Sequence, residues 1–175
     1  MPLLKILKYP NPLLRKRSKA VKKIDGSISK LVADMAETMH LAPGVGLAGP
    51  QVGELVRVIV VDIGEGLIAI INPKIVKRGG EQTYVEGCLS LPKLEGPVTR
   101  SSSVAVTGLD EKGRPVTLEA VELLATVIQH EIDHLDGKLF IDRVSDPADI
   151  RPMTRTEALQ RDKVCIEGKS EECMM

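Results

Sequence analysis

The residues most able to do chemistry stand together in the run Gln129-His130-Glu131-Ile132-Asp133-His134. Residues four positions apart share one face of an α-helix, so the imidazoles of His130 and His134 can bind the same metal ion. Glu131 directly follows the first histidine, where a carboxylate can move a proton for a metal-activated water. The run therefore predicts metal-dependent hydrolysis. The alternative interpretation is a pair of core histidines with ordinary hydrogen bonds.

Both histidines must lie on a helix for this prediction to hold. Residues 118–128 are mostly apolar and contain neither Pro nor Gly, and acidic residues stand in the first turns, where the helix dipole favours them. Gly137, three residues after His134, favours a helix end. We predict a helix that begins near residue 118 and carries both histidines in its last turns.

A catalytic metal usually takes three protein ligands, so the site needs one more. His40 is the only other histidine and abuts a glycine-rich loop, where we expect it to support the loop. Cys88 lies in the stretch 85–92, which is broken by Gly and ended by Pro and so suits a strand edge or bend beside a site. A free cysteine is often only a small core residue. The metal-binding helix in the same chain favours Cys88 as the third ligand.

The segments before this helix predict how these groups are positioned. Asp25 to Leu41 is expected to form an amphipathic helix, capped by Asp25 or Ser27. The glycine-rich loop 43–53 contains G-x-G-x-x-G. A dinucleotide-binding loop follows a strand and opens a helix, whereas a helix precedes this loop and a strand at 56–62 follows it. The glycines instead indicate close approach by another ligand, such as a peptide.

Further strands are predicted at 66–72, 83–85, 103–109 and 115–119, and Asp110 to Gly113 forms a hairpin turn. Hairpin-linked strands indicate an α+β fold with antiparallel sheets around a central helix that carries the H-E-x-x-H motif. The fold class also includes an N-terminal helix and a short C-terminal helix over 154–164. We predict one catalytic domain over 1–175, with a polar tail from about 145.

Composition limits the function classes. Net charge is zero and aromatic residues make up 2% of the chain, which argues against a field that attracts nucleic acid or membranes and against base stacking. No apolar run is long enough to span a bilayer, no secretory segment is evident, and the three cysteines do not suggest a disulfide framework, so we expect a cytoplasmic protein. Residues 1–24 carry eight Lys or Arg and no acid, which we interpret as a folded basic arm.

Three ordered motifs resemble those of the peptide deformylase family: residues 44–51, 86–90 and 129–134. The resemblance covers about 4–143. It implies hydrolysis of the formyl group from N-formylmethionyl peptides, with release of formate. By the same resemblance Cys88, His130 and His134 hold one divalent metal, Fe(II) first and Zn, Ni or Co as alternatives.

The resemblance also implies roles for other residues. Glu131 takes a proton from water and returns it to the departing amine. The Gln51 amide and the Leu89 N–H stabilise the oxyanion. Val45, Gly46 and Gly87 pair with the peptide backbone like an added strand. The candidates for the methionine pocket are Val45, Tyr84, Glu86, Leu123, Val127 and His130. Glu86 is expected to pair with Arg100, and Asp133 to support the site. The resemblance allows the ribosome as a transient partner, although the C-terminal tail is unlike the long basic helix of some members.

Some positions depart from the family pattern. Gly49 stands where the family usually has Ala, which suggests a more flexible loop, and Glu95 lies where some members place a basic residue over the substrate.

Two other function classes stay open. One is a zinc endopeptidase or aminopeptidase, although no histidine follows His134. The other is a non-enzymatic domain, either stapled by metal or binding N-terminal peptides. A formate-release assay separates the three.

Overall fold

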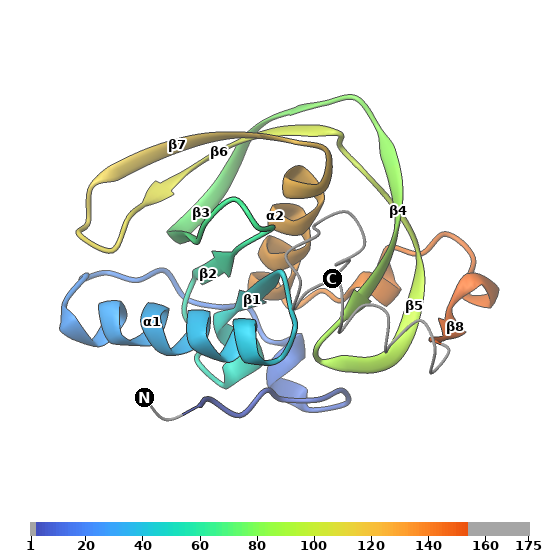
Figure 1. Ribbon diagram of the computed structural model, residues 1–175, viewed down its shortest axis with the longest axis horizontal. Helices are drawn as coiled ribbons and strands as arrows, with labels where there is room; N and C mark the ends of the chain where they lie inside the picture. Colours follow the sequence, from blue (N-terminus) through green and yellow to red (C-terminus); the bar gives the residue numbers. More distant parts are fainter. Residues whose placement is uncertain (1–2, 154–175) are drawn as a thin grey trace.

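The computed structural model describes residues 3–153, which form two antiparallel β-sheets and two α-helices (Figure 1). The helices are α1 (Gly26–Leu41) and α2 (Glu122–Leu135). These residues also form four short 3-10 helices: η1 (Pro12–Arg15), η2 (Gly49–Val52), η3 (Phe140–Asp142) and η4 (Pro147–Asp149). The predicted α+β class with antiparallel sheets is confirmed. The predicted C-terminal helix over 154–164 lies outside the described residues.

The larger sheet has five strands in the order β1-β2-β3-β6-β7, which are β1 (Gly46–Ala48), β2 (Val58–Val61), β3 (Ile68–Gly79), β6 (Ser103–Leu109) and β7 (Pro115–Val121). The smaller sheet has the order β4-β5-β8, from β4 (Gln82–Cys88), β5 (Leu91–Arg100) and β8 (Arg151–Pro152). Neighbouring strands are antiparallel throughout. β1 and β4 are therefore edge strands, each with one side unpaired within its sheet.

The larger sheet is covered on both faces near β2. Successive side chains of a strand point to opposite faces, so the strand divides its apolar residues between two layers. Val58 and Val60 pack in the cluster that includes α1, and Ile59 and Val61 pack in the cluster that includes α2. All four are buried, which explains the continuous apolar run of this strand. Figure 1 shows α1 and α2 on either side of this part of the sheet.

The first helix follows its predicted boundaries. The Asp25 side chain caps it by accepting a hydrogen bond of 3.0 Å from the Ser27 N–H. Val32, Met35 and Met39 lie on its buried face, with at most 1% of their surface exposed. Within residues 3–153, no helix has both the length and the apolar character needed to cross a membrane.

The second helix begins later than its composition predicts. Residues 118–121 belong to β7, where they pair with residues 103–106 of β6, so the predicted helix start near 118 is wrong. The backbone turns at Glu122, which has a positive φ of 51° and donates its N–H to the Ser102 carbonyl at 2.8 Å. Pairing with β6 therefore outweighs the local helical preference of these four residues.

The prediction lacks β8, which has only two residues, and two further strands, β5 and β1. β5 contains Pro92, Gly96 and Pro97, residues that locally disfavour a strand, yet it pairs with β4 along nearly its whole length. The three-residue β1 lies inside the glycine-rich loop and pairs with β2. In both cases a neighbouring strand supplies the hydrogen bonds that local composition does not suggest.

Candidate metal centre

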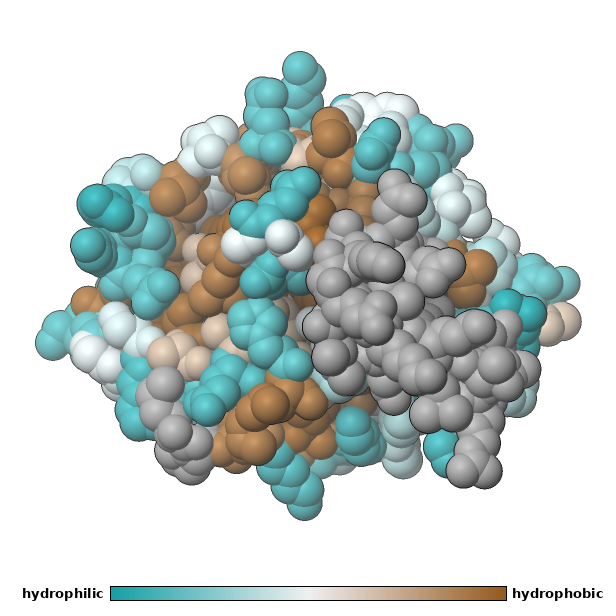
Figure 2. Space-filling view, in the orientation of Figure 1, coloured by the Kyte–Doolittle hydropathy of each residue, from teal (hydrophilic) through white to brown (hydrophobic). Residues whose placement is uncertain are grey.

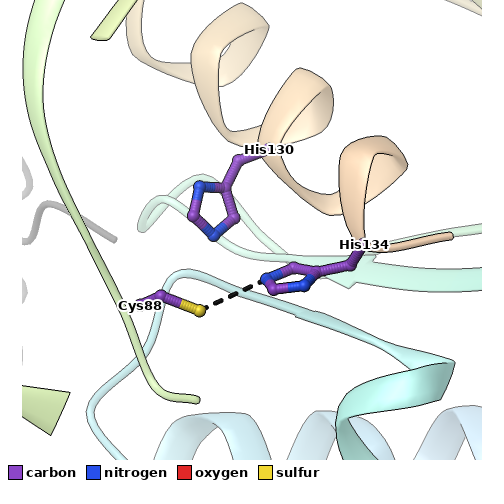
Figure 3. Close-up of side chains that lie close together, drawn as sticks. All are labelled: Cys88, His130 and His134. Atoms are coloured by element: carbon purple, nitrogen blue, oxygen red, sulfur yellow. Dashed lines mark hydrogen bonds between the residues drawn. The ribbon is translucent and has the colours of Figure 1, made fainter. Parts of the chain in front are cut away.

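Cys88 at the end of β4 and the two histidines of α2 converge on one point (Figure 3). Their ligand atoms all lie within 4.8 Å of one another, and Cys88 Sγ is 3.2 Å from His134 Nε2. The exposed fractions are 8% for Cys88, 3% for His130 and 1% for His134. Three buried groups that can each ligate a metal are therefore already in place around a common centre.

Local backbone geometry explains this convergence. His130 and His134 are one helical turn apart, so both rings leave α2 on the same face. On β4, the register with β5 shifts between Gly87 and Cys88, and Cys88 pairs with Leu91 across a tight turn. This irregularity ends the strand and leaves the cysteine facing the helix, as expected for a bulge beside a functional site.

The charge of the sulfur is supported by its neighbours. Burial opposes ionisation of Cys88, but His134 and His130 outweigh this effect and hold the pKa of the thiol well below its usual value. Gln51 Nε2 and the Ser90 N–H point toward the sulfur at 3.5 and 3.4 Å. A thiolate that accepts such hydrogen bonds is a strong ligand for a transition metal.

These residues fit a divalent metal ion. A thiolate with two imidazoles suits Fe(II), Zn, Ni and Co alike, whereas a magnesium or calcium site would use oxygen ligands. On the His134 ring, Nδ1 has no hydrogen-bond partner among the described residues, while Nε2 faces the sulfur. Nε2 is therefore the atom of His134 that is placed to bind an ion together with the sulfur.

Glu131 lies beside this centre and is 2% exposed. Burial raises the pKa of its carboxyl to about 7. Its Oε2 atom has no partner among residues 3–153. Gly46 leaves room for the carboxylate, because a Cβ at that position would lie 2.3 Å from Glu131 Oε1. The missing side chain of Gly46 thus allows the buried carboxylate of Glu131 to stand against an edge strand.

His130 is oriented by an ion-paired network behind it. Its Nδ1 lies 3.0 Å from Glu86 Oε2. A carboxylate accepts, so Nδ1 carries the hydrogen and Nε2 is left for a metal. Arg100 binds both oxygens of Glu86, at 2.5 and 2.9 Å, which confirms the predicted pair. These contacts join the ligand on α2 to β4 and β5.

The same network continues to Asp133, the residue before His134 on α2. Arg100 Nη1 donates to Asp133 Oδ2 at 2.8 Å, and Arg143 donates twice to Asp133, at 2.6 and 3.0 Å. Burial opposes ionisation of Asp133, but Arg143 and Arg100 overcome it and lower its pKa. Asp133 was expected to support the site, and it does so through Arg100. Arg143 was missed, because nothing local marks an arginine in a loop after the helix.

The two candidate oxyanion donors lie next to Cys88. Gln51 in η2 is 1% exposed, and its Oε1 accepts a hydrogen bond of 2.8 Å from the Ala48 N–H. This contact fixes the amide so that its Nε2 faces Ser90 Oγ, at 3.2 Å, and the sulfur. Leu89 lies in the turn between β4 and β5. Both candidates are therefore within the immediate surroundings of the candidate metal ligands.

The candidate peptide-binding residues lie at two edge strands and on α2. Gly46 is the first residue of β1, Val45 directly precedes it, and Gly87 is the residue before Cys88 on β4. Tyr84 is half-buried on β4, opposite Val98 of β5. Val127 is completely buried in the core beneath α2, and Leu123 packs against that core. Apolar residues gather near the middle of the face in Figure 2, with hydrophilic residues around its rim.

Three remaining candidates have structural explanations. His40 Nε2 lies 3.0 Å from Asp62 Oδ2, outside the metal group, and its side chain is 51% exposed, as expected for a loop support. Glu95 is 3% exposed and pairs with Arg151 at 2.7 Å. The expectation of a more flexible loop at Gly49 stays a prediction, but the space around this residue is defined. A Cβ there would lie 2.7 Å from the carbonyl oxygens of Glu54 and Val56, so this glycine is tightly enclosed.

A glutamate next to three converging ligands places the chain among the metal-dependent hydrolases. The family model for polypeptide deformylase matches residues 3–149. A peptide deformylase of Pelotomaculum thermopropionicum is 51% identical over 146 residues, covering 83% of this chain and 94% of the relative. One from Acetivibrio thermocellus is 52% identical over 153 residues, covering 87% and 90%.

The fold agrees with these matches. The crystal structure of peptide deformylase from Thermotoga maritima has a TM-score of 0.82 and 41% identity, and covers 83% of this chain and 100% of that one. The chain belongs to the polypeptide deformylase family. The enzyme removes the formyl group from the N-terminal formyl-methionine of newly made polypeptides and releases formate. This activity excludes the endopeptidase and non-enzymatic hypotheses.

Proposed function

We propose that Cys88, His130 and His134 hold one divalent cation, Fe(II) in the cell, with Zn, Ni or Co able to replace it. Their convergence within 4.8 Å is the observation that carries this assignment. When bound, the metal supplies Lewis-acid activation of water and of the formyl carbonyl. Metal analysis of protein purified without oxygen, paired with activity, tests the choice of ion.

Glu131 is the proton carrier in this proposal. Its carboxylate accepts a proton from the attacking water as the new C–O bond forms, and it delivers that proton to the amine nitrogen as the C–N bond breaks. Formate and a free N-terminal amine are then released. The support is positional: the carboxylate is buried beside the ligands, against the start of β1.

Gln51 Nε2 and the Leu89 N–H serve as the donors that stabilise the oxyanion. Gln51 is suited to this role because its Oε1 is held by Ala48, so its Nε2 faces the centre without reorganising. Leu89 directly follows the sulfur ligand in the chain. Donors that follow strands of two different sheets would thus meet at one substrate atom.

The peptide itself is proposed to bind as an extra strand between β1 and β4. Each strand is at the edge of its sheet and so has backbone groups available for pairing. Val45, Gly46 and Gly87 supply these backbone groups. The methionine side chain is assigned to a pocket lined by Val45, Tyr84, Glu86, Leu123, Val127 and His130. An unbranched thioether suits such a mostly apolar lining.

N-formylmethionyl peptides are the substrates, so we propose transient contact with the ribosome in the cytoplasm, where such chains emerge. Co-sedimentation of the enzyme with translating ribosomes tests this partner. The polar tail from residue 154 lies outside the described residues, and the proposal does not depend on it.

Replacement of Cys88 by Ser tests the metal assignment. A hydroxyl is a much poorer ligand than a thiolate for these metals, so we expect metal content after dialysis to fall well below one per chain, together with formate release. Cys173→Ser serves as the control thiol and should leave both unchanged. Full metal retention in Cys88→Ser would overturn the ligand set.

A further inference from the structure

The basic N-terminal arm contacts the segment that carries the first oxyanion donor. The Leu7 N–H donates to the backbone carbonyl of Gln51 at 2.7 Å. The Leu7 side chain lies near Gly53, the residue that caps η2. The arm therefore holds η2 by its backbone, on the same residue whose side-chain amide faces the metal ligands.

The next two residues contact the second donor. The Lys8 ammonium donates to the backbone carbonyl of Leu89. The Tyr9 N–H donates to the carbonyl of Ser90 at 2.8 Å. Three consecutive residues thus bind the backbones of both donors in turn, first Gln51 and then the Leu89–Ser90 turn.

The two donors need such a link because they follow strands of different sheets. Gln51 follows β1 of the five-stranded sheet, and Leu89 follows β4 of the three-stranded sheet. Strand pairing does not join these two sheets, so neither ladder sets the distance between the donors. The Gln51–Ser90 side-chain contact of 3.2 Å is a direct connection, and the Leu7–Tyr9 segment is a second one.

The arm is itself anchored on both sides of this segment. Before it, the Leu4 N–H donates to Thr38 Oγ1 of α1 at 3.0 Å, and Leu4 and Ile6 pack in the α1 cluster. After it, Leu14 is fully buried in the cluster that contains Cys88. The dark blue chain in Figure 1 accordingly runs along the base of the molecule, below both sheets. Anchors at both ends make Leu7–Tyr9 a rigid element.

We propose that the Leu7–Tyr9 segment positions the two oxyanion donors relative to each other, with Lys8 as the positioning residue of the Leu89 turn. This inference rests on the donor roles proposed for Gln51 and Leu89. Lys8 acts through the Leu89 carbonyl and does not touch the substrate. Its ammonium replaces water at that carbonyl and so resists movement of the turn.

Three lysine variants test this inference. Lys8→Met removes the donor but keeps the apolar stem, and Lys8→Arg restores a cationic donor. Lys5→Met changes an exposed lysine of the same arm. Displacement of a catalytic donor by a fraction of an ångström is expected to lower kcat by about tenfold in Lys8→Met. KM, metal content and melting temperature should stay near the parent values. Lys8→Arg should recover most of the rate, and Lys5→Met should equal the parent.

The split between kcat and KM is the decisive measurement, because general loosening of the arm would lower stability or metal content instead. Unchanged kcat in Lys8→Met would overturn the inference, as would an equal loss in Lys5→Met or a loss seen only in KM. Gln51→Ala, measured alongside, separates the two proposals. If it leaves kcat unchanged, the donor assignment fails; if it lowers kcat and Lys8→Met does not, only the positioning role fails.

Discussion

Two faces of α2 differ in how completely their polar groups are hydrogen-bonded. On the face toward β1, Glu131 Oε2 has no partner among the described residues. On the other face, Asp133 accepts three hydrogen bonds from Arg100 and Arg143. Buried polar atoms without partners are costly, whereas a satisfied network is rigid. The helix thus keeps reactive atoms available on one side and fixes their positions from the other.

The largest expected effect comes from the reactive face. Glu131→Gln keeps the shape of the side chain and removes the proton carrier, so formate release should fall by about 10²- to 10⁴-fold. Metal content should remain near one per chain, because Glu131 is not a ligand in this assignment. Steady-state kinetics with metal analysis measure both. Near-normal turnover would remove Glu131 from its role and weaken the contrast between the faces.

Gly46→Ala tests whether the reactive face depends on the space beside it. The new Cβ would stand 2.3 Å from Glu131 Oε1, so the carboxylate must move. A displacement of about 1 Å is expected to lower kcat by about 100-fold, again with metal retained. Gly26→Ala is the matched control, since nothing lies within 4 Å of the Cβ it would add. Equal activity of both variants would show that the carboxylate tolerates the shift.

Asp133→Asn tests the supporting face. It removes the negative charge that Arg100 and Arg143 share. Arg100 then holds Glu86, and Glu86 holds His130, less firmly, so the metal dissociation constant should rise by about 10- to 100-fold. The free energy of unfolding should fall by about 1–3 kcal/mol, because Arg100 and Arg143 lose a charged acceptor while Arg100 keeps Glu86. Chelator competition and urea unfolding measure these changes.

The control for Asp133→Asn is Asp136→Asn, at the helix end. Asp136 pairs with Arg57 at 2.8 Å and its side chain is 29% exposed, so the loss should be about 1 kcal/mol or less with unchanged metal affinity. If metal affinity fell equally in both variants, charge near the helix would matter in general and the network would have no special role.

Arg143→Gln gives the smallest expected effect and tests how far the network extends. The Arg143 side chain is 42% exposed, and Arg100 would still pair with Asp133 in its absence. We expect a loss of about 1 kcal/mol or less in unfolding free energy and a correspondingly small change in metal affinity. A loss of stability larger than that of Asp133→Asn would mean that the exposed Arg143, and not the buried Asp133, is the main stabilising residue of the network.

One helix and one hairpin of the fold were predictable from local patterns. The cap at Asp25, the apolar face of α1 and the hairpin between β6 and β7 all follow from residues close together in the chain. The start of α2 was not predictable, because residues 118–121 gain more from pairing with β6 than from one more helical turn. β5 was not predictable either, because its prolines and glycine disfavour a strand locally. The hydrogen bonds that make it a strand come from its pairing with β4.

Spacing along one helix was enough to predict that His130 and His134 share a metal, because the period of a helix is a property of the backbone. Resemblance of short motifs was enough to predict the chemistry. The approach of Cys88, the clearance at Gly46 and the contacts of the arm were decided only in the folded chain. They depend on packing between segments remote in sequence, and no local preference of a residue type specifies its distant neighbours.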